Sequence, residues 1–311
     1  MPSNKLKGFT LGILAAASYG TNPLFALPLY DAGLTADSVL FLRYLAALPV
    51  LALLMAFRGQ PFAVQGRQWG LLVVMGMLVA MSSLFLFLSY NYMDVGIASS
   101  ILFVYPVMVA CIMAFFFHER AGAVTIGCIA MATAGIGMMM KTSDGAMVSI
   151  MGMVMSLLSA LTYAIYIVAV NKTSLHRVPT LTVTLYVLLF GVSLFLVRLL
   201  MAGEPLFPAL PGIKEWGCVA GLAILPTAVS FACTTGAIQS IGSTPTAILG
   251  AFEPVTAVLV GVFVFGETLT TMAFIGLVLV IAAVSLVVAA PNLHMHIQLT
   301  HVRKLFPRRR R

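Results

Sequence analysis

Hydrophobic residues occur along this chain in ten long runs, separated by mostly short polar connections. An α-helix rises about 1.5 Å per residue, so about 20 apolar residues cross a hydrocarbon core about 30 Å thick. A membrane β-barrel has alternating segments of about ten residues instead. The pattern predicts ten membrane-spanning helices, with these expected ranges: Gly8–Pro28, Ala36–Phe57, Trp69–Tyr90, Gly96–Phe117, Ala123–Met140, Ser149–Val170, Thr180–Met201, Lys214–Ile238, Thr244–Phe265 and Thr271–Ala290.

The composition excludes an ordinary soluble domain. The chain is 61% hydrophobic and only 8% charged, whereas roughly 25% of the residues of a soluble domain are charged. The short connections leave no room for a large domain outside the membrane. We therefore expect one all-α integral membrane unit that acts within or across the lipid bilayer, with no nucleic acid partner.

Positive charge is distributed unevenly about the expected spans. With the N-terminus in the cytoplasm, 13 of the 17 lysines and arginines fall on the cytoplasmic side, which is the usual bias of membrane proteins. The chain ends in RKLFPRRRR, residues 303–311, which is basic enough to lie against an anionic leaflet. We expect a multi-pass protein of the plasma or inner membrane, with both termini cytoplasmic.

The fourth and ninth runs contain matching residues. Pro106 matches Pro254 and Glu119 matches Glu267, and both pairs are 148 residues apart. The chain therefore contains an internal repeat.

A second match places the repeat over the whole chain. The segment LAAASYG, residues 14–20, aligns with LSALTYA, residues 158–164, so the first run is a structural span rather than a cleaved signal peptide. We expect a first repeat over residues 1–145, a second over 146–290 and a basic tail over 291–311. Five spans per half is an odd number, so the second half is inverted relative to the first, as in many secondary transporters.

Glu253 is the carboxylate expected deepest in a span. A charge near the centre of a membrane helix costs about 2.5 to 3.5 kcal/mol on insertion scales, so it usually faces a cavity or a partner. Pro254 removes a backbone donor and predicts a kink at this point, and the first repeat has Tyr105 where the second has Glu253. Either Glu253 binds a cationic substrate group or a coupling proton, or it holds the fold through hydrogen bonds to neighbouring helices.

Two further acids and one arginine have structural and functional interpretations. Glu119 and Glu267 lie at helix ends beside short turns, where a carboxylate caps the free amides of the next helix, so we expect structural roles for both. Arg43 lies about 10 Å into the second run, shallow enough to reach the interface or to pair with Asp37 or Asp31. The alternative is that Arg43 binds a substrate carboxylate.

Aromatic and small polar residues within the spans are candidates for a binding cavity. Amphipathic rings with a few polar groups suit a small-molecule site, although such residues also pack helices or lie at the membrane interface. The candidates are Tyr19, Asn22, Tyr105, Tyr163, Tyr166 and Ser230.

The sequence offers no pattern for a metal, a cofactor or a catalytic centre. The four cysteines lie in or at the edges of the runs without a CxxC pair, which argues against a disulfide framework and a zinc site. Three of the five histidines lie in the C-terminal tail without a metal-binding spacing. We expect no metal, no cofactor and no enzyme activity.

Three segments, together with the ten spans, resemble the EamA-type repeats of the drug/metabolite transporter superfamily over about residues 8–290. They are YPVMVACIMAFFFHER from residue 105, EPVTAVLVGVFVFGETLT from residue 253 and LPTAVSFACTTGAIQSIGSTPTAIL from residue 225. The resemblance implies a ten-helix inverted-repeat carrier with a central cavity bounded by the first, third, fourth, sixth, eighth and ninth helices. It also implies that the candidate cavity residues and Glu253 lie on cavity-side helices.

The resemblance implies a secondary transporter that moves a small organic metabolite, such as an amino acid or a related compound, by alternating access. Export is the expected direction, and proton coupling through Glu253 is a further hypothesis. The alternatives are a channel or uniporter-like facilitator and a membrane-embedded enzyme. The expected partners are a small-molecule substrate, the bilayer and, as a hypothesis, a second copy of the chain in a homodimer.

Overall fold

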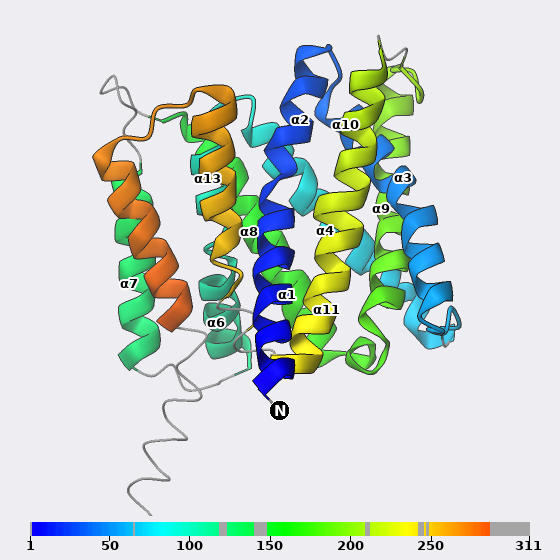
Figure 1. The fold of residues 1–311 in the computed structure, drawn as a ribbon, viewed down its shortest axis with the longest axis horizontal. Coiled ribbons are helices and arrows are strands. Elements are labelled where there is room, and N and C mark those ends of the chain that lie inside the picture. Colours follow the sequence, from blue (N-terminus) through cyan, green and yellow to red (C-terminus); the bar gives the residue numbers. More distant parts are fainter. Residues whose placement is uncertain are drawn as a thin grey trace, which may run out of the picture.

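The computed structural model of the protein describes residues 2–64, 66–117, 123–139, 148–208, 212–241, 246 and 249–286, and the regular structure of this part is helical throughout (Figure 1). The helices of the first half are α1 (Pro2–Gly20), α2 (Asn22–Asp31), α3 (Ala36–Phe57), η1 (Gly66–Gln68), α4 (Trp69–Ser89), α5 (Val95–Leu102), α6 (Tyr105–Phe116) and α7 (Ala123–Met138). Those of the second half are α8 (Ile150–Lys172), η2 (Ser174–Arg177), α9 (Thr180–Ala202), α10 (Ile213–Ala223), the π-helix η3 (Ile224–Val229), α11 (Ser230–Ile241), α13 (Phe252–Phe265) and a last helix, Thr271–Leu286.

Grouped across their breaks, the helices of the described residues make ten passages through the molecule. The first passage is α1 with α2, the fourth is α5 with α6, and the eighth is α10, η3 and α11. Six helical stretches of the described residues are long and apolar enough to cross a membrane, and shorter apolar helices add to them. The expected all-α fold with ten membrane helices is confirmed.

The fourth and ninth passages run in opposite directions. Glu267, just after α13, accepts a hydrogen bond from the backbone N–H of Val95 at the start of α5, so α13 ends at the face from which α5 departs. This geometry is that of an inverted repeat. The proposed repeat boundary at residues 145/146 and the tail from residue 291 lie outside the described residues, and both stay predictions.

For two of the ten passages we compare the helix ends predicted from the hydrophobic pattern with those in the structure. The second passage, α3, occupies Ala36–Phe57 as predicted. The ninth was predicted as a span over Thr244–Phe265 with a kink at Pro254. The chain does turn there, at Gly250 and Ala251, and α13 starts at Phe252. The N–H of Glu253 bonds to the carbonyl of Gly250 over 2.9 Å, which closes the turn.

The fourth passage breaks at the matching place. Helix α5 ends at Leu102 and α6 begins at Tyr105, so the break at residues 103–104 lies one repeat before the break at residues 250–251. Pro106 and Pro254 follow the two breaks. Each proline is tolerated in the first turn of the new helix, where its missing donor has no partner to lose.

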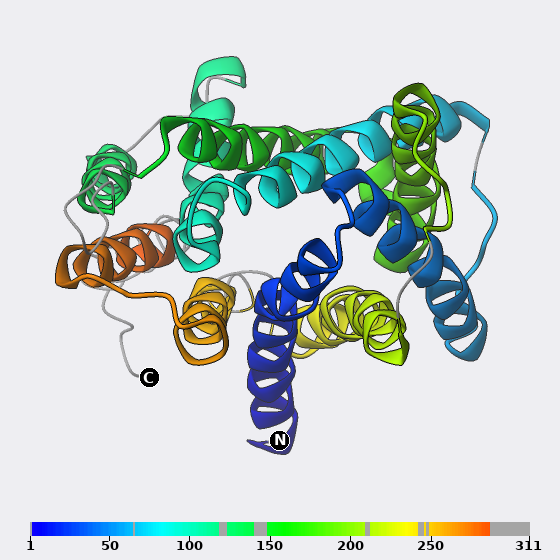
Figure 2. The same ribbon diagram turned by 90° about the horizontal axis from the view of Figure 1, so that it is seen from above.

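The passages form two layers with a helix pair at one end (Figure 2). Helices α8, α4 and α9 lie side by side in one layer, and α13, α1 and α11 lie in the other. Helix α7 and the last helix stand together at one end of the molecule, whereas α3 packs against α9 at the opposite end.

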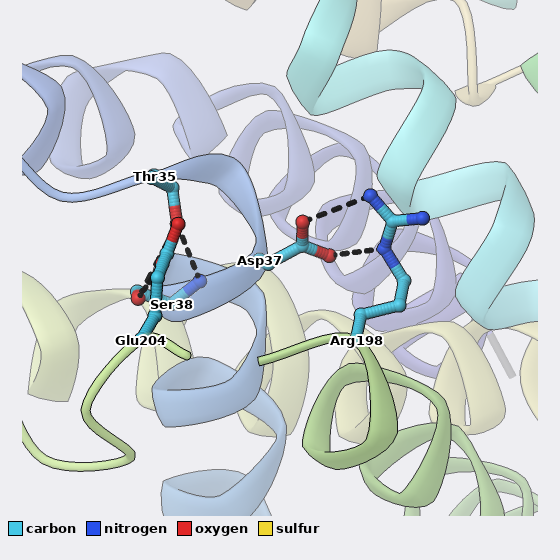
Figure 3. Close-up of polar contacts among 5 residues, drawn as sticks. All are labelled: Thr35, Asp37, Ser38, Arg198 and Glu204. Atoms are coloured by element: carbon cyan, nitrogen blue, oxygen red, sulfur yellow. Dashed lines mark hydrogen bonds and ion pairs between the residues drawn. The ribbon is translucent and has the colours of Figure 1, made fainter. Parts of the chain in front are cut away.

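A polar cluster joins α3 to α9 at the face opposite the N-terminus (Figure 3). Arg198 forms a bidentate ion pair with Asp37, with N–O distances of 2.6 and 3.0 Å. The Glu204 carboxylate accepts hydrogen bonds from the hydroxyls of Thr35, at 2.7 Å, and Ser38, at 3.3 Å. The expected pairing of Asp37 with Arg43 is therefore wrong, because Arg198 occupies that carboxylate.

Candidate functional site

A cavity of about 340 Å³ lies between the two layers, in the middle of the molecule. Its volume falls in the range of about 300–1,000 Å³ that small-molecule sites occupy. The lining residues belong to the first, third, fourth, sixth, eighth and ninth passages, which are those expected to bound it. They are Gly12, Ala15, Ala16, Tyr19, Val79, Ser82, Ser83, Leu86, Leu102, Tyr105, Ser159, Tyr163, Ser230, Phe231, Thr234, Thr246, Gly250 and Glu253.

Most of the predicted cavity residues meet at this place. Those that line the cavity are Tyr19, Tyr105, Tyr163, Ser230 and Glu253. Tyr166 does not line it but stacks on Tyr163, with ring centres 5.8 Å apart, and so supports the wall from behind.

Asn22 lies beside the break between α1 and α2 rather than in the cavity wall. Its amide donates a hydrogen bond to the carbonyl of Tyr19 over 2.8 Å, and its buried side-chain oxygen has no hydrogen-bond partner. In this structure Asn22 therefore shapes the backbone next to Tyr19, and its predicted contact with a substrate stays a prediction.

Glu253 occupies the first turn of α13, where the half-helix begins at the centre of the molecule. Helix α1 approaches this turn closely. A Cβ atom added at Gly20 would lie only 2.5 Å from the carbonyl oxygen of Glu253. Tyr19 and Tyr105 lie close enough to Glu253 to interact with it electrostatically. Among the described residues none donates a hydrogen bond to the Glu253 carboxylate, so its oxygens are available to a proton or a ligand.

The wall serines are held by hydrogen bonds within the protein. Ser82 on α4 and Ser159 on α8 each donate to the other's backbone carbonyl, over 3.0 and 2.7 Å. Ser230 donates to the carbonyl of Ala15 over 3.0 Å and joins α11 to α1. Ser82 and Ser159 were not predicted as cavity residues, because a small hydroxyl residue in an apolar span indicates close helix packing as readily as a binding site.

Arg43 is buried in the molecule rather than extended to the interface, and its side chain is only 5% exposed. Its Nε lies 3.4 Å from the hydroxyl of Thr227, and its guanidinium carbon lies 5.6 Å from the ring centre of Phe87. Within the described chain it forms no ion pair. The expected position at the interface is wrong, because aromatic contacts hold the cation inside, and binding of a substrate carboxylate by Arg43 stays a prediction.

Arg43, Phe87 and Tyr90 pack together, and with Tyr19, which lines the cavity, these residues are named the closing layer. Arg43 lies over Phe87, and the rings of Phe87 and Tyr90 are 5.5 Å apart. Helix α1 starts at the N-terminal face, so Gly12 in the cavity wall lies about 10 Å nearer that face than Tyr19. The cavity therefore extends from the closing layer toward the face that carries the N-terminus.

Glu267 lies away from the cavity, at the face opposite the N-terminus. Its two carboxylate oxygens accept hydrogen bonds from the backbone N–H groups of Val95, at 2.8 Å, and Gly96, at 3.3 Å. It thus caps α5 of the other half rather than the next helix in the chain. Burial raises the pKa of the Glu267 carboxyl and Asp94 adds to the rise, whereas the two N–H groups oppose it. Glu119 lies outside the described residues.

Comparisons with known proteins agree with this architecture. Residues 6–141 and 150–289 match the EamA-like transporter family. A protein of Archaeoglobus fulgidus described as an uncharacterized transporter is 29% identical over 191 residues, which is 61% of this chain and 66%, just under two thirds, of that protein. A crystal structure of a protein with 21% identity superposes with a TM-score of 0.64 and covers 92% of this chain and 96% of the other, which supports the fold alone.

Proposed function

The chain belongs to the EamA-like transporter family, and from this premise we propose that it is a secondary transporter that carries a small organic metabolite by alternating access. The family and the Archaeoglobus relative identify a multi-pass membrane transporter. The proposal adds a substrate of the class of amino acids and related compounds, export as the direction, and coupling to protons through Glu253.

One observation supports the proposal most strongly: a small-molecule cavity between the two inverted halves, beside matched breaks in the fourth and ninth passages. Carriers built from inverted repeats bind substrates near the middle of the membrane, where discontinuous helices expose polar groups. Tyr105 starts one half-helix and Glu253 lies in the first turn of the other, and both line the cavity. A single cavity between two half-helices suits a carrier, which binds one substrate molecule at a time.

The one-sided position of the cavity supports alternating access. The closing layer buries Arg43 and Phe87, which are 5% and 0% exposed, and the cavity lies on its N-terminal side. A channel needs a path that is continuous when open, whereas a carrier closes one side while the other is open. This structure fits a carrier state that faces the N-terminal side.

Glu253 supports the proposed coupling to protons. An ionised carboxylate inside a membrane protein is costly unless it is paired, and no described residue donates a hydrogen bond to this one. A proton or a cationic substrate group would each satisfy it. Because the same oxygens serve both, binding of one would displace the other, which is the basis of exchange transport.

The proposal predicts saturable flux through the purified protein in proteoliposomes. A screen that compares metabolites in cells overproducing and lacking the protein supplies the candidate substrate. Uptake of that labelled compound should saturate with concentration and should accelerate when unlabelled compound is present inside the vesicles. Flux that rises without saturation and without acceleration would show a channel.

Proton coupling is tested in the same vesicles with Glu253→Gln. The wild-type flux should depend on an imposed pH gradient, whereas the variant should lose that dependence because its amide does not exchange a proton. An unchanged response to the gradient in Glu253→Gln would eliminate the proton role and leave the carrier function intact.

A further inference from the structure

The charges in the cavity wall are unbalanced. Glu253 is the one acidic residue among the described residues that line the cavity, and the same lining contains no lysine, arginine or histidine. Its carboxylate receives no hydrogen bond from the described chain. A ligand that enters the cavity thus meets an acidic side chain without a basic one beside it.

Arg43 does not supply the missing positive charge within the cavity. It lies in the closing layer, where Thr227 and the ring of Phe87 contact its guanidinium. Tyr19, which lines the cavity, interacts electrostatically with both Arg43 and Glu253. Arg43 itself is not among the residues that line the cavity.

Three tyrosines line the cavity together with Glu253. Tyr19, Tyr105 and Tyr163 all line the cavity and all interact electrostatically with Glu253. The rings of Tyr105 and Tyr163 meet edge to face, with centres 4.9 Å apart. Aromatic rings that line a small site attract ammonium groups through their π electrons, most strongly where water is excluded.

The serine hydroxyls of the cavity wall have few hydrogen-bond donors left for a neutral polar ligand. Ser82, Ser159 and Ser230 already donate their hydroxyl hydrogens to backbone carbonyls, and Ser83 is bonded to Tyr44 over 2.6 Å. A sugar-like ligand needs free donors as well as acceptors. The serines of the wall are thus poorly matched to a polyol.

We propose that the cavity selects small organic cations, whose ammonium group binds the Glu253 carboxylate within the rings of Tyr19, Tyr105 and Tyr163. This inference rests on the proposed carrier function. Among small organic metabolites, it favours amines over the amino acids named there. A carboxylate on the ligand lowers the affinity, because no cationic side chain of the described wall receives it. Amines and methylated amines are therefore preferred to zwitterionic amino acids.

Three compounds of nearly the same shape test the proposal on the purified full-length protein. Choline is a cation, and neohexanol (3,3-dimethylbutan-1-ol) is its uncharged carbon isostere. Glycine betaine has the same trimethylammonium group but a carboxylate in place of the hydroxymethyl group of choline. Binding is measured by calorimetry and by the rise in melting temperature that a ligand of the folded state produces. Choline should bind at least about tenfold more tightly than either of the other two.

Variants assign the selectivity to the named residues. Glu253→Gln keeps the shape of the side chain and should weaken choline binding by about tenfold or more. Tyr163→Phe retains the ring and should bind choline nearly as well as the wild type, whereas Tyr163→Leu should bind it more weakly. The melting temperature without ligand checks that each variant is folded.

Equal binding of choline and neohexanol, tighter binding of glycine betaine, or no binding of choline would each overturn the inference. Undiminished choline binding by folded Glu253→Gln would overturn it as well. These outcomes are separate from the proposed function: saturable, accelerated exchange of a neutral or zwitterionic compound in proteoliposomes would leave the carrier standing and remove only the cation selectivity.

Discussion

Glu267, which follows α13 in the second half, binds two backbone N–H groups of the first half through its side chain. Its carboxylate accepts the N–H groups of Val95 and Gly96, which lie 172 and 171 residues earlier in the chain. These amides are among the free donors of a helix N-terminus, and a negative group there is favoured by the helix dipole. One side chain thus fixes the fourth passage against the ninth.

Glu267→Ala should lower the free energy of unfolding by about 1–3 kcal/mol, because two partly buried amides lose their acceptor. The raised pKa of the Glu267 carboxyl means that the folded protein keeps this proton to higher pH than the unfolded chain does. The stability from Glu267 is therefore greatest below the unfolded pKa of about 4.3 and declines as pH rises through the folded value.

Thermal unfolding in detergent at several pH values measures this effect. The difference between wild type and Glu267→Ala should shrink as pH rises, while Asp31→Ala, which removes an exposed acid, should track the wild type. A difference that grows with pH, or a variant as stable as the wild type, would contradict the assignment.

At single residues, the sequence identified the groups that are unusual in a membrane span. Glu253 and the deep tyrosines stand out because polar groups in lipid need a partner or a cavity. Arg43 was misplaced because its depth along the helix says nothing about its neighbours, and Phe87 and Thr227, which hold it, come from distant elements. The distance from a span end does not reveal such tertiary contacts.

At the scale of the helix, the breaks were harder to foresee than the spans. The prolines Pro106 and Pro254 mark two breaks, and Pro226 lies inside the π-helix η3. Pro28 and Pro49, however, lie inside α2 and α3 without ending them. Any proline removes one backbone hydrogen-bond donor, but contacts with the surrounding helices determine whether the helix continues past it. The sequence alone therefore does not distinguish a proline at a helix break from one inside a continuous helix.

The crossing of α7 with the last helix depends on two glycines. A Cβ at Gly276 would lie 2.5 Å from the carbonyl oxygen of Gly135, and a Cβ at Gly135 would lie 2.8 Å from that of Gly276. Both contacts are with backbone, which cannot rotate away. Small residues of this kind allow close approach of membrane helices.

Gly276→Ala should therefore destabilise the protein by about 1–3 kcal/mol through overpacking. Gly127→Ala is the matched control on α7, because a Cβ there meets nothing within 4 Å, and it should unfold at the wild-type temperature or slightly above it. The melting temperatures of both variants in detergent provide the check. If Gly276→Ala is as stable as Gly127→Ala, the helices do not cross as described.

At the scale of the whole molecule, the architecture follows from counting. Ten spans, a repeat offset of 148 residues and five spans per half imply inverted halves, and the opposed fourth and ninth passages agree. The side on which the cavity lies does not follow, because under the proposed alternating access two states share one sequence and differ by only a few kcal/mol.

The most direct test of a one-sided carrier cavity is thiol labelling of the variant Thr234→Cys. Thr234 lies on α11 in the cavity wall. The substitution is made in a protein whose four native cysteines have been replaced. A membrane-impermeant thiol reagent is applied to sealed vesicles of known orientation, with Ala202→Cys, an exposed position at the opposite face, as the control. The account predicts rapid labelling of Thr234→Cys from the face that carries the N-terminus and little from the other. Equal labelling from both faces, or labelling only from the face opposite the N-terminus, would contradict it.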